Sequence, residues 1–129
     1  MGDKVSKRIL VVDDEPEICT FMKGLLEKAG HQVTTAQVLP STVAALIADR
    51  YDLVTVDLKM PDMDGADVAR LARAVDANMP IVVVSAYLNP IVEAQLRDLG
   101  VRFFIRKPFR AEELVQAVAA ALLDSETPA

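Results

Sequence analysis

The segment DLVTVDLKMPDMDG, residues 52–65, combines the clearest strand signal in this chain with an acidic residue placed directly after the strand. The run LVTV at residues 53–56 is short, partly β-branched and bounded by turn-forming residues, which predicts a parallel strand buried on both faces between layers of helices. Asp57 then stands at the carboxyl end of this strand, where ligands bind in open α/β sheets. Pro61 and Gly65 then turn the chain away from the line of the strand. Asp57 is therefore the candidate reactive group.

The composition is that of one globular domain. The 129 residues suffice for a buried core, and an apolar content of 52% is too high for a disordered segment. The net charge of −5 argues against a general nucleic-acid binder, which needs clustered Lys and Arg. No apolar stretch reaches the length of a membrane span, and the first residues lack the apolar core of a signal peptide. We expect a cytoplasmic domain at residues 7–123, with tails at residues 1–6 and 124–129, that neither binds nucleic acid directly nor enters a membrane.

The single cysteine, Cys19, excludes an internal disulfide and fits a reducing compartment. The single histidine, His31, falls at the start of a predicted strand, whereas Cys19 falls on a predicted helix among apolar residues. A catalytic pair is possible in principle, but a packed thiol is the better interpretation of Cys19.

Strand and helix signals alternate along the whole chain, which predicts a parallel sheet with helices on both faces and right-handed crossovers. The expected strands are residues 8–12, 31–35, 53–56, 81–84 and 101–105. The expected helices are residues 16–29, 38–49, 64–75, 89–100 and 111–123. The third of these helices should turn four apolar residues inward: Val68, Leu71, Ala72 and Val75.

Three of the predicted helix starts have recognisable signals. Pro16 is tolerated in the first turn of a helix, with Asp14 or Glu15 as the capping residue. Pro40 moves the firm start of the second helix to about Ser41, whose hydroxyl is the expected cap. For the third, the acidic turn at residues 62–65 faintly resembles a calcium loop. The ligand spacing and final glutamate of such a loop are missing, so a turn that caps the helix is the preferred interpretation.

Polar side chains follow four of the predicted strands, and the carboxyl ends of parallel strands meet at one edge. This edge brings together Asp13 with Asp14, Asp57, Ser85 and Lys107. Two carboxylates about 4 Å apart repel by roughly 4 kcal/mol at an effective dielectric constant near 20, so a cation must offset them. Mg²⁺ suits a site with a few carboxylates and room for phosphate oxygens. Lys107 and Ser85 can each contact a phosphoryl oxygen, which makes an aspartyl-phosphate site the predicted chemistry.

Four motifs occur in order at successive strand ends: VVDDEP at residues 11–16, VDLKMPDMDG at 56–65, VVSA at 83–86 and RKPF at 106–109. Each motif alone is modest evidence, but their joint order is highly specific. Over residues 7–123 the chain resembles the receiver domain of response regulators in two-component and phosphorelay signalling. This resemblance implies a flavodoxin-like, doubly wound, three-layer α/β sandwich, with five helices around a five-stranded parallel sheet of order 2-1-3-4-5.

The resemblance implies that Asp57 accepts a phosphoryl group from a phosphohistidine on a sensor histidine kinase or a histidine phosphotransfer protein. Mg²⁺ would be held by Asp57, directly by Asp14, through water by Asp13, and by the backbone carbonyl of Lys59. The chain would then be a phosphoacceptor switch that catalyses only its own phosphorylation and dephosphorylation.

The resemblance also assigns roles around the phosphoryl group. Ser85 would move toward the phosphoryl oxygen and Lys107 would pair with it, and the Lys107–Pro108 peptide bond would be cis. Phe104 matches an aromatic switch position whose ring turns inward when the Ser85 hydroxyl shifts; without a hydroxyl of its own, it would act through packing alone. Ala86 matches a position kept small so that the phosphoryl donor can approach.

Phosphorylation adds nearly two negative charges, so contacts made in only one state would bias a two-state equilibrium and change the affinity for an unknown partner protein. The surface expected to respond consists of residues 89–100, 101–105 and 111–123. Lys59 and Tyr87, each two residues beyond a site residue, flank the expected path of attacking water. We therefore expect these two large side chains to alter the lifetime of the phosphorylated state.

Several alternatives remain at this point. The acidic cluster at residues 13–15 could be a solvated helix start, Lys107 an ordinary surface lysine, and Phe104 a core residue. A flavin protein of the same fold would need a phosphate loop after the first strand, but DDEPE there would repel phosphate. A haloacid-dehalogenase-like phosphatase would need an aspartate where Lys59 stands. A receiver-like scaffold that is not phosphorylated is the main alternative, and the chain could be a stand-alone regulator or part of a longer protein.

Overall fold

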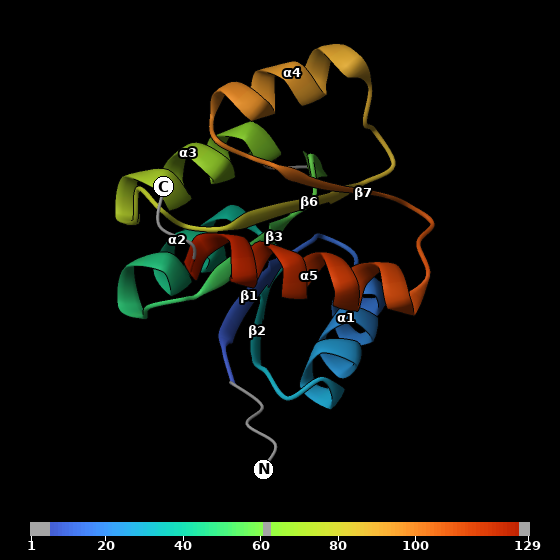
Figure 1. Cartoon of the computed structure of the whole chain (residues 1–129). Coiled ribbons are helices and arrows are strands. Elements are labelled where there is room, and N and C mark those ends of the chain that lie inside the picture. Colours follow the sequence, from blue (N-terminus) through green and yellow to red (C-terminus); the bar gives the residue numbers. More distant parts are fainter. Residues whose placement is uncertain (1–5, 61–62, 127–129) are drawn as a thin grey trace.

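The computed structural model describes residues 6–60 and 63–126 and contains a parallel five-stranded sheet (Figure 1). Along the sheet the strands are β2 (Gln32–Ala36), β1 (Arg8–Val12), β3 (Leu53–Val56), β6 (Ile81–Ser85) and β7 (Phe103–Arg106). Every neighbouring pair is parallel. Counted along the chain, these five strands have the order 2-1-3-4-5, so the predicted flavodoxin-like topology is confirmed.

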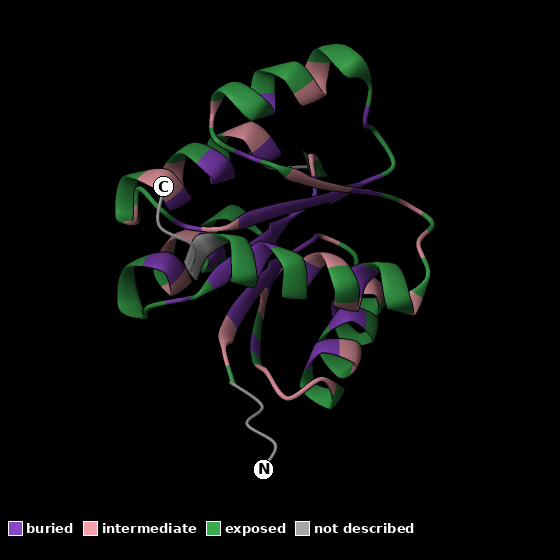
Figure 2. Cartoon of the chain, viewed as in Figure 1, coloured by how far each residue is buried: buried purple, intermediate pink, exposed green. Residues whose placement is uncertain are grey.

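Five helices cover the two faces of this sheet: α1 (Pro16–Lys28), α2 (Leu39–Ala48), α3 (Gly65–Val75), α4 (Pro90–Asp98) and α5 (Ala111–Glu126). Buried residues of α1 and α5 pack with one face of the sheet, and those of α2, α3 and α4 pack with the other. The three central strands, β1, β3 and β6, are buried along most of their length, while the helices turn exposed faces outward (Figure 2). The apolar run LVTV is buried at all four positions, as expected for a central strand between two helix layers.

A short hairpin that the sequence patterns did not predict follows the central strand. Its strands are β4 (Lys59–Met60) and β5 (Met63–Asp64), which pair antiparallel. Two-residue strands carry too little pattern to be recognised from sequence. The turn expected at Pro61 and the weak calcium-loop signal at Asp62 lie outside the described residues.

Gly65 begins α3 directly against the end of β3. A Cβ atom at this position would lie 2.6 Å from the Asp57 carbonyl oxygen and 2.7 Å from the Leu58 Cα atom. Both neighbours are backbone atoms, which cannot move aside as a flexible side chain can. Only glycine therefore allows α3 to start this close to Asp57.

The helix starts confirm some capping predictions and correct others. Neither Asp14 nor Glu15 caps α1 through its side chain; instead the Asp13 carboxylate accepts a hydrogen bond from the Glu15 amide at 3.0 Å. The second helix begins at Leu39, before the predicted start, because proline fits within a first helical turn. Ser41 is therefore inside the helix, and its hydroxyl donates to the Val38 carbonyl instead of capping.

Side chains cap the next two helices. The Asp64 carboxylate accepts from the Ala66 amide at 3.0 Å, so the acidic turn does cap α3. The Asn89 side chain accepts from the Val92 amide at 3.0 Å and caps α4.

Several predicted boundaries and one predicted core residue were wrong. The second strand is shifted by one residue, and β7 begins two residues later than expected. The last helix continues to Glu126, past its predicted end at residue 123, while residues 127–129 lie outside the described part. Val75, the last residue of α3, is 47% exposed rather than buried.

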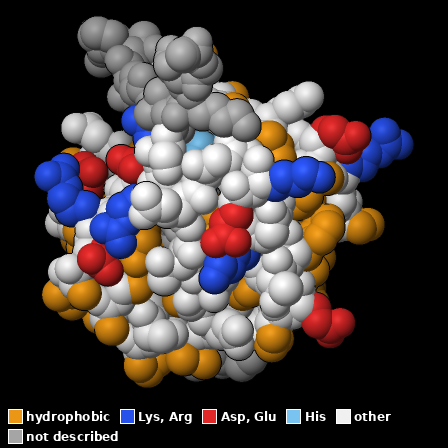
Figure 3. Space-filling view, turned by 90° about the horizontal axis from the view of Figure 1, so that it is seen from below, with side chains coloured by type: hydrophobic (Ala, Val, Ile, Leu, Met, Phe, Trp, Pro, Cys, Tyr) orange, Lys and Arg blue, Asp and Glu red, His pale blue; other side chains and the backbone are white. Residues whose placement is uncertain are grey.

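The surface visible in Figure 3, the molecule seen from below, carries acidic and basic side chains close to one another, with apolar side chains around them. Surface ion pairs such as that between Arg8 and Asp49 at 3.6 Å bring the two signs of charge together. Among the described residues, no helix has the length and apolar composition required to cross a bilayer.

Candidate functional site

Backbone hydrogen bonds just beyond the strands place the predicted site residues at one edge of the sheet. The Asp57 amide donates to the Val12 carbonyl at 3.0 Å, and the Lys107 amide donates to the Ser85 carbonyl at 3.1 Å. The Asp13 amide is held in the same way by the edge strand β2. The sheet's own hydrogen-bonding pattern therefore fixes the backbone of each of these residues before any side-chain contact is made.

The side chains that meet at this edge are mostly buried. Asp57 is 5% exposed, Asp13 1% and Ser85 fully buried. The Lys107 Nζ atom lies 2.6 Å from Asp13 Oδ2, 3.3 Å from Asp57 Oδ2 and 3.4 Å from Glu15 Oε1. One ammonium thus contacts three carboxylates from two separate segments of the chain, and Lys107 is not an ordinary surface lysine.

Burial and charge shift the pKa values of this cluster. Burial raises the pKa of Asp13 above its usual range, although hydrogen bonds from Lys107 and from the Glu15 amide partly offset the effect. Burial also acts against the charge of Lys107, but the hydrogen bond and attraction to Asp13, together with the attraction to Asp57, outweigh it and raise the pKa of this lysine. Lys107 therefore stays charged while the acidic cluster holds more negative charge than it can neutralise.

The acidic cluster has the donor set of a magnesium site. Carboxylate oxygens of Asp13, Asp14, Glu15 and Asp57 all lie within 4.8 Å of one another. These are hard oxygen ligands, and Asp14 and Glu15 are partly or fully exposed, which leaves space for water molecules on the ion. The residues present therefore fit Mg²⁺. Glu15 was not among the predicted ligands, although its place as the third acidic residue after β1 was a usable signal.

A pocket of about 520 Å³ opens above Asp57. It is lined by Asp14, Glu15, Asp57, Lys59, Met60, Ala86, Tyr87 and Lys107. The predicted small position, Ala86, and the two predicted flanking residues, Lys59 and Tyr87, are thus all in its wall. The Lys59 Nζ atom lies 4.7 Å from the centre of the Tyr87 ring. Met60 is the pocket residue for which the sequence offered no signal, because its hairpin was not foreseen.

Ser85 and Phe104 are the two predicted switch residues. The Ser85 hydroxyl accepts a hydrogen bond from the Tyr87 amide at 3.0 Å. Phe104, on β7, is half-buried against the core, and the guanidinium carbon of Arg97 lies 4.8 Å from the centre of its ring. The Lys107–Pro108 peptide bond is cis, as expected.

Cys19 is a packed thiol, as predicted. It is 2% exposed, and its Sγ atom donates to the Asp13 carbonyl at 3.2 Å. Burial, reinforced by the nearby Asp13 carboxylate, raises the pKa of the thiol to about 11. At neutral pH this cysteine is not a nucleophile.

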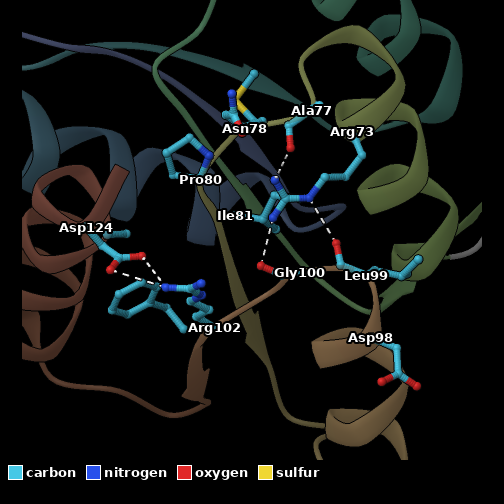
Figure 4. Close-up of a pocket in the computed structure, with 13 residues that line it drawn as sticks. Arg73, Ala77, Asn78, Pro80, Ile81, Asp98, Leu99, Gly100, Arg102 and Asp124 are labelled. Carbon is cyan, nitrogen blue, oxygen red and sulfur yellow. Dashed lines mark hydrogen bonds and ion pairs between the residues drawn. The ribbon is translucent and has the colours of Figure 1, made fainter. Parts of the chain in front are cut away.

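A larger pocket, about 820 Å³, lies at the opposite edge, beside the amino ends of β6 and β7 (Figure 4). The Arg73 guanidinium donates to three backbone carbonyl oxygens at 2.8–2.9 Å: those of Ala77, Leu99 and Gly100. Arg102 pairs with Asp124 at 3.1 Å. These polar groups satisfy one another and brace neighbouring loops, so we assign this pocket a structural role.

Residues 9–119 match the response regulator receiver domain. The sensory/regulatory protein RpfC of Xanthomonas campestris pv. campestris is 36% identical over 118 residues, which are 88% of this chain and 16% of RpfC. The DNA-binding response regulator MtrA of Mycolicibacterium smegmatis is 34% identical over 124 residues, which are 96% of this chain and 54% of MtrA. The chain therefore spans about half the length of MtrA and a smaller part of RpfC.

Solved structures agree with these sequence relatives. The structure of a CheY-like response regulator receiver domain protein from Methanospirillum hungatei JF-1 superposes with a TM-score of 0.89 at 27% identity. The match covers 95% of this chain and 98% of that protein. The similarity thus extends over nearly the whole of both chains.

Proposed function

This chain belongs to the family of response regulator receiver domains, and on that basis we propose that Asp57 is its phosphoacceptor. Receiver domains are signalling switches, and histidine kinases phosphorylate them. The further proposal concerns this chain's own residues: which carboxylate reacts, which groups stabilise the product and which surface responds. We propose that residues 7–123 form the phosphoacceptor domain.

In the proposed reaction an Asp57 carboxylate oxygen attacks the phosphorus of a phosphohistidine on the partner. The new O–P bond forms as the N–P bond breaks, and the departing imidazole nitrogen takes a proton from solvent. Asp57 loses its carboxylate charge and carries a phosphoryl group with nearly two negative charges. Hydrolysis by water would later return the carboxylate and release phosphate.

The residues around Asp57 have distinct roles in this proposal. Asp14, Asp57 and the Lys59 carbonyl would hold Mg²⁺, with Asp13 acting through water; when bound, the ion neutralises charge on the transferring phosphoryl oxygens. Lys107 orients the Asp57 carboxylate before transfer and pairs with a phosphoryl oxygen afterwards. Ala86 leaves the mouth of the pocket open to the donor.

The contact of Lys107 with both Asp13 and Asp57 is the observation that carries the proposal. A partly buried ammonium shared by carboxylates that follow different strands is poised to change partner when one of those carboxylates is modified. Neither a solvated helix start nor a surface lysine would have this geometry. A flavin site and a dehalogenase-type phosphatase site are also less consistent with the four carboxylates gathered here.

The proposed output is a change of surface. The Ser85 hydroxyl would turn toward the phosphoryl oxygen, the Phe104 ring would repack, and the surface formed by α4, β7 and α5 would change its affinity for a protein partner. We place this switch in the cytoplasm. MtrA is named as a DNA-binding response regulator, so the absence of direct nucleic-acid contact by the present chain is only a prediction.

Intact mass spectrometry after incubation with acetyl phosphate and Mg²⁺ tests this proposal. We expect a gain of one phosphoryl group that is lost in Asp57→Asn and in a sample with chelator. A folded protein that gains no phosphoryl group, beside a control receiver that does, would favour the non-phosphorylated scaffold. A gain that persists in Asp57→Asn would show that another residue accepts the group.

A further inference from the structure

The pocket around Asp57, called the acceptor pocket below, holds more negative than positive charge. Phosphorylation of Asp57 would increase this excess. Four carboxylates lie together, and the Lys107 ammonium contacts three of them. A bound divalent cation reduces the excess negative charge but does not remove it, and a phosphoryl group on Asp57 adds to it again. A second cation close to the phosphoryl oxygens would therefore be stabilising.

Lys59 is the residue placed to supply that cation. Among the described residues that line the pocket, Lys59 and Lys107 are the two with positive charge. The Lys59 amide lies 3.4 Å from Asp57 Oδ1, and its side chain is exposed. The ammonium can thus approach the acceptor by rotation about its own side-chain bonds, without movement of the backbone.

In the unphosphorylated protein the Lys59 ammonium has another partner. Its Nζ atom lies over the Tyr87 ring, 4.7 Å from the ring centre, and the ring is 56% exposed. A cation–π contact at an exposed site is weak, whereas a charge-assisted hydrogen bond from an ammonium to phosphate is strong. The Tyr87 ring and the phosphoryl oxygens would therefore compete for the Lys59 ammonium. Phosphorylation would shift the ammonium from the ring to the phosphoryl oxygens.

We infer that Lys59 is a second phosphoryl-binding cation, held on the Tyr87 ring until Asp57 is phosphorylated and then transferred to the phosphoryl oxygens. This inference rests on the proposed function of Asp57. Tyr87 also reports on the pocket through its backbone, because its amide donates to the Ser85 hydroxyl. Tyr87 thus contacts both the Lys59 ammonium and the Ser85 hydroxyl, two groups that lie close to Asp57.

The exchange has a consequence beyond the pocket. Lys59, Met60 and Tyr87 also line a neighbouring groove of about 810 Å³ between α3 and α4. When the ammonium leaves the ring, the wall shared by the pocket and the groove changes. Phosphorylation would thus be transmitted to the α3–α4 side of the molecule as well as to the surface of α4, β7 and α5.

The chain is well suited to a direct test, because it has two tyrosines and no tryptophan. Full-length protein labelled with 3-fluorotyrosine should give one fluorine resonance for Tyr51 and one for Tyr87, assigned with Tyr51→Phe and Tyr87→Phe. Tyr51 is an internal control, since the guanidinium carbon of Arg8 lies 5.4 Å from its ring centre, at the opposite edge of the sheet. Acetyl phosphate with Mg²⁺ is the probe, and the mass of the same sample measures phosphorylation.

We expect phosphorylation to shift the Tyr87 resonance and to leave the Tyr51 resonance in place. Lys59→Met should move the Tyr87 resonance in the same direction before any phosphorylation and should remove most of the later shift. Lys59→Arg, which keeps a cation, should retain the response, and Arg8→Met should move only the Tyr51 resonance. Lys59 and Arg8 are both at the surface, so these variants should fold.

The experiment distinguishes a failure of the Lys59 inference from a failure of the proposed function. A mass gain with an unmoved Tyr87 resonance, or with the same shift in Lys59→Met as in the unaltered chain, would overturn the inference and leave the phosphoacceptor role intact. The absence of a mass gain in folded protein would overturn the proposed function, and the inference would fall with it.

Discussion

The two edges of the sheet use cations in opposite ways. At the amino edge, Arg73 donates to three backbone carbonyls and Arg102 pairs with Asp124, so each charge has a partner of its own. At the carboxyl edge, Lys107 alone contacts three carboxylates. The first arrangement is complete without a ligand, whereas the second leaves negative charge that a bound cation would relieve.

This difference explains why pocket size is a poor guide to function here. The pocket at the amino edge is larger, about 820 Å³ against about 520 Å³, yet its two arginines already have partners among the residues that line it. The smaller pocket contains Asp57, a buried carboxylate whose neighbours compete for one ammonium. Unbalanced charge, rather than volume, is the feature that distinguishes the proposed reactive site.

The sharpest test of the comparison is to remove one cation from each edge. Lys107→Met leaves the buried carboxylates of Asp13 and Asp57 without their ammonium and should lower the free energy of unfolding by about 3 kcal/mol. Arg102→Met removes an exposed ion pair and should lower it by less than about 1 kcal/mol. Urea denaturation of both variants measures the difference. Equal losses would mean that the two edges do not differ as described.

The brace at the amino edge should matter for stability but not for phosphorylation. Arg73→Lys keeps the charge but loses the planar fork that reaches several carbonyls, so we expect a loss of about 2 kcal/mol. Phosphorylation by acetyl phosphate, followed by mass, should proceed as in the unaltered chain. A folded variant with impaired phosphorylation would contradict the purely structural role of this edge.

Magnesium should stabilise the protein through the carboxyl edge alone. At a concentration tenfold above its dissociation constant, Mg²⁺ should raise the free energy of unfolding by about 1.4 kcal/mol. Thermal unfolding with and without the ion should show this gain for the unaltered chain and lose it in Asp14→Asn. Asp98→Asn, beside the other pocket, is the matched control and should keep the gain. An unchanged gain in Asp14→Asn would place the ion elsewhere.

The two large side chains over the acceptor pocket should protect the phosphorylated state from water. Lys59→Ala and Tyr87→Ala each open the wall of the pocket, so we expect the phosphorylated lifetime to shorten by about threefold or more. The decay of the phosphorylated mass after removal of acetyl phosphate measures it. Unchanged lifetimes in both variants would dismiss this role.

The smallest expected effect concerns pH at the amino edge. Burial lowers the pKa of His31 below 6.5, with the attraction of Asp52 partly opposing the shift, so the unfolded chain binds the proton more tightly. Stability from this residue is therefore present above about pH 6.5 and is lost as the pH falls through the lower folded value. Urea denaturation at about pH 5 and pH 8 should show a weaker pH dependence in His31→Asn, which keeps an acceptor for the Lys7 amide. If the pH dependence of stability is unchanged in this variant, it arises from carboxylates rather than from His31.

Local patterns in the sequence were sufficient for the sheet and for the residues at its carboxyl edge. A run such as LVTV specifies a strand through its own composition, and parallel strands must end at one edge, so Asp57, Ser85 and Lys107 had to come near one another. The ends of elements were less predictable. The start of α2 and the end of α5 depend on which local hydrogen bonds compete, and such differences are small.

Contacts between distant segments could not be foreseen. The sequence places Lys107 at the correct edge, but only the packed structure shows that its ammonium meets Asp13 more closely than Asp57. The same holds for Lys59 over Tyr87 and for Arg73 against the α4–β7 connection. Strand composition is a local property of the chain, whereas side-chain partners depend on register, helix position and burial, which exist only once the layers have packed.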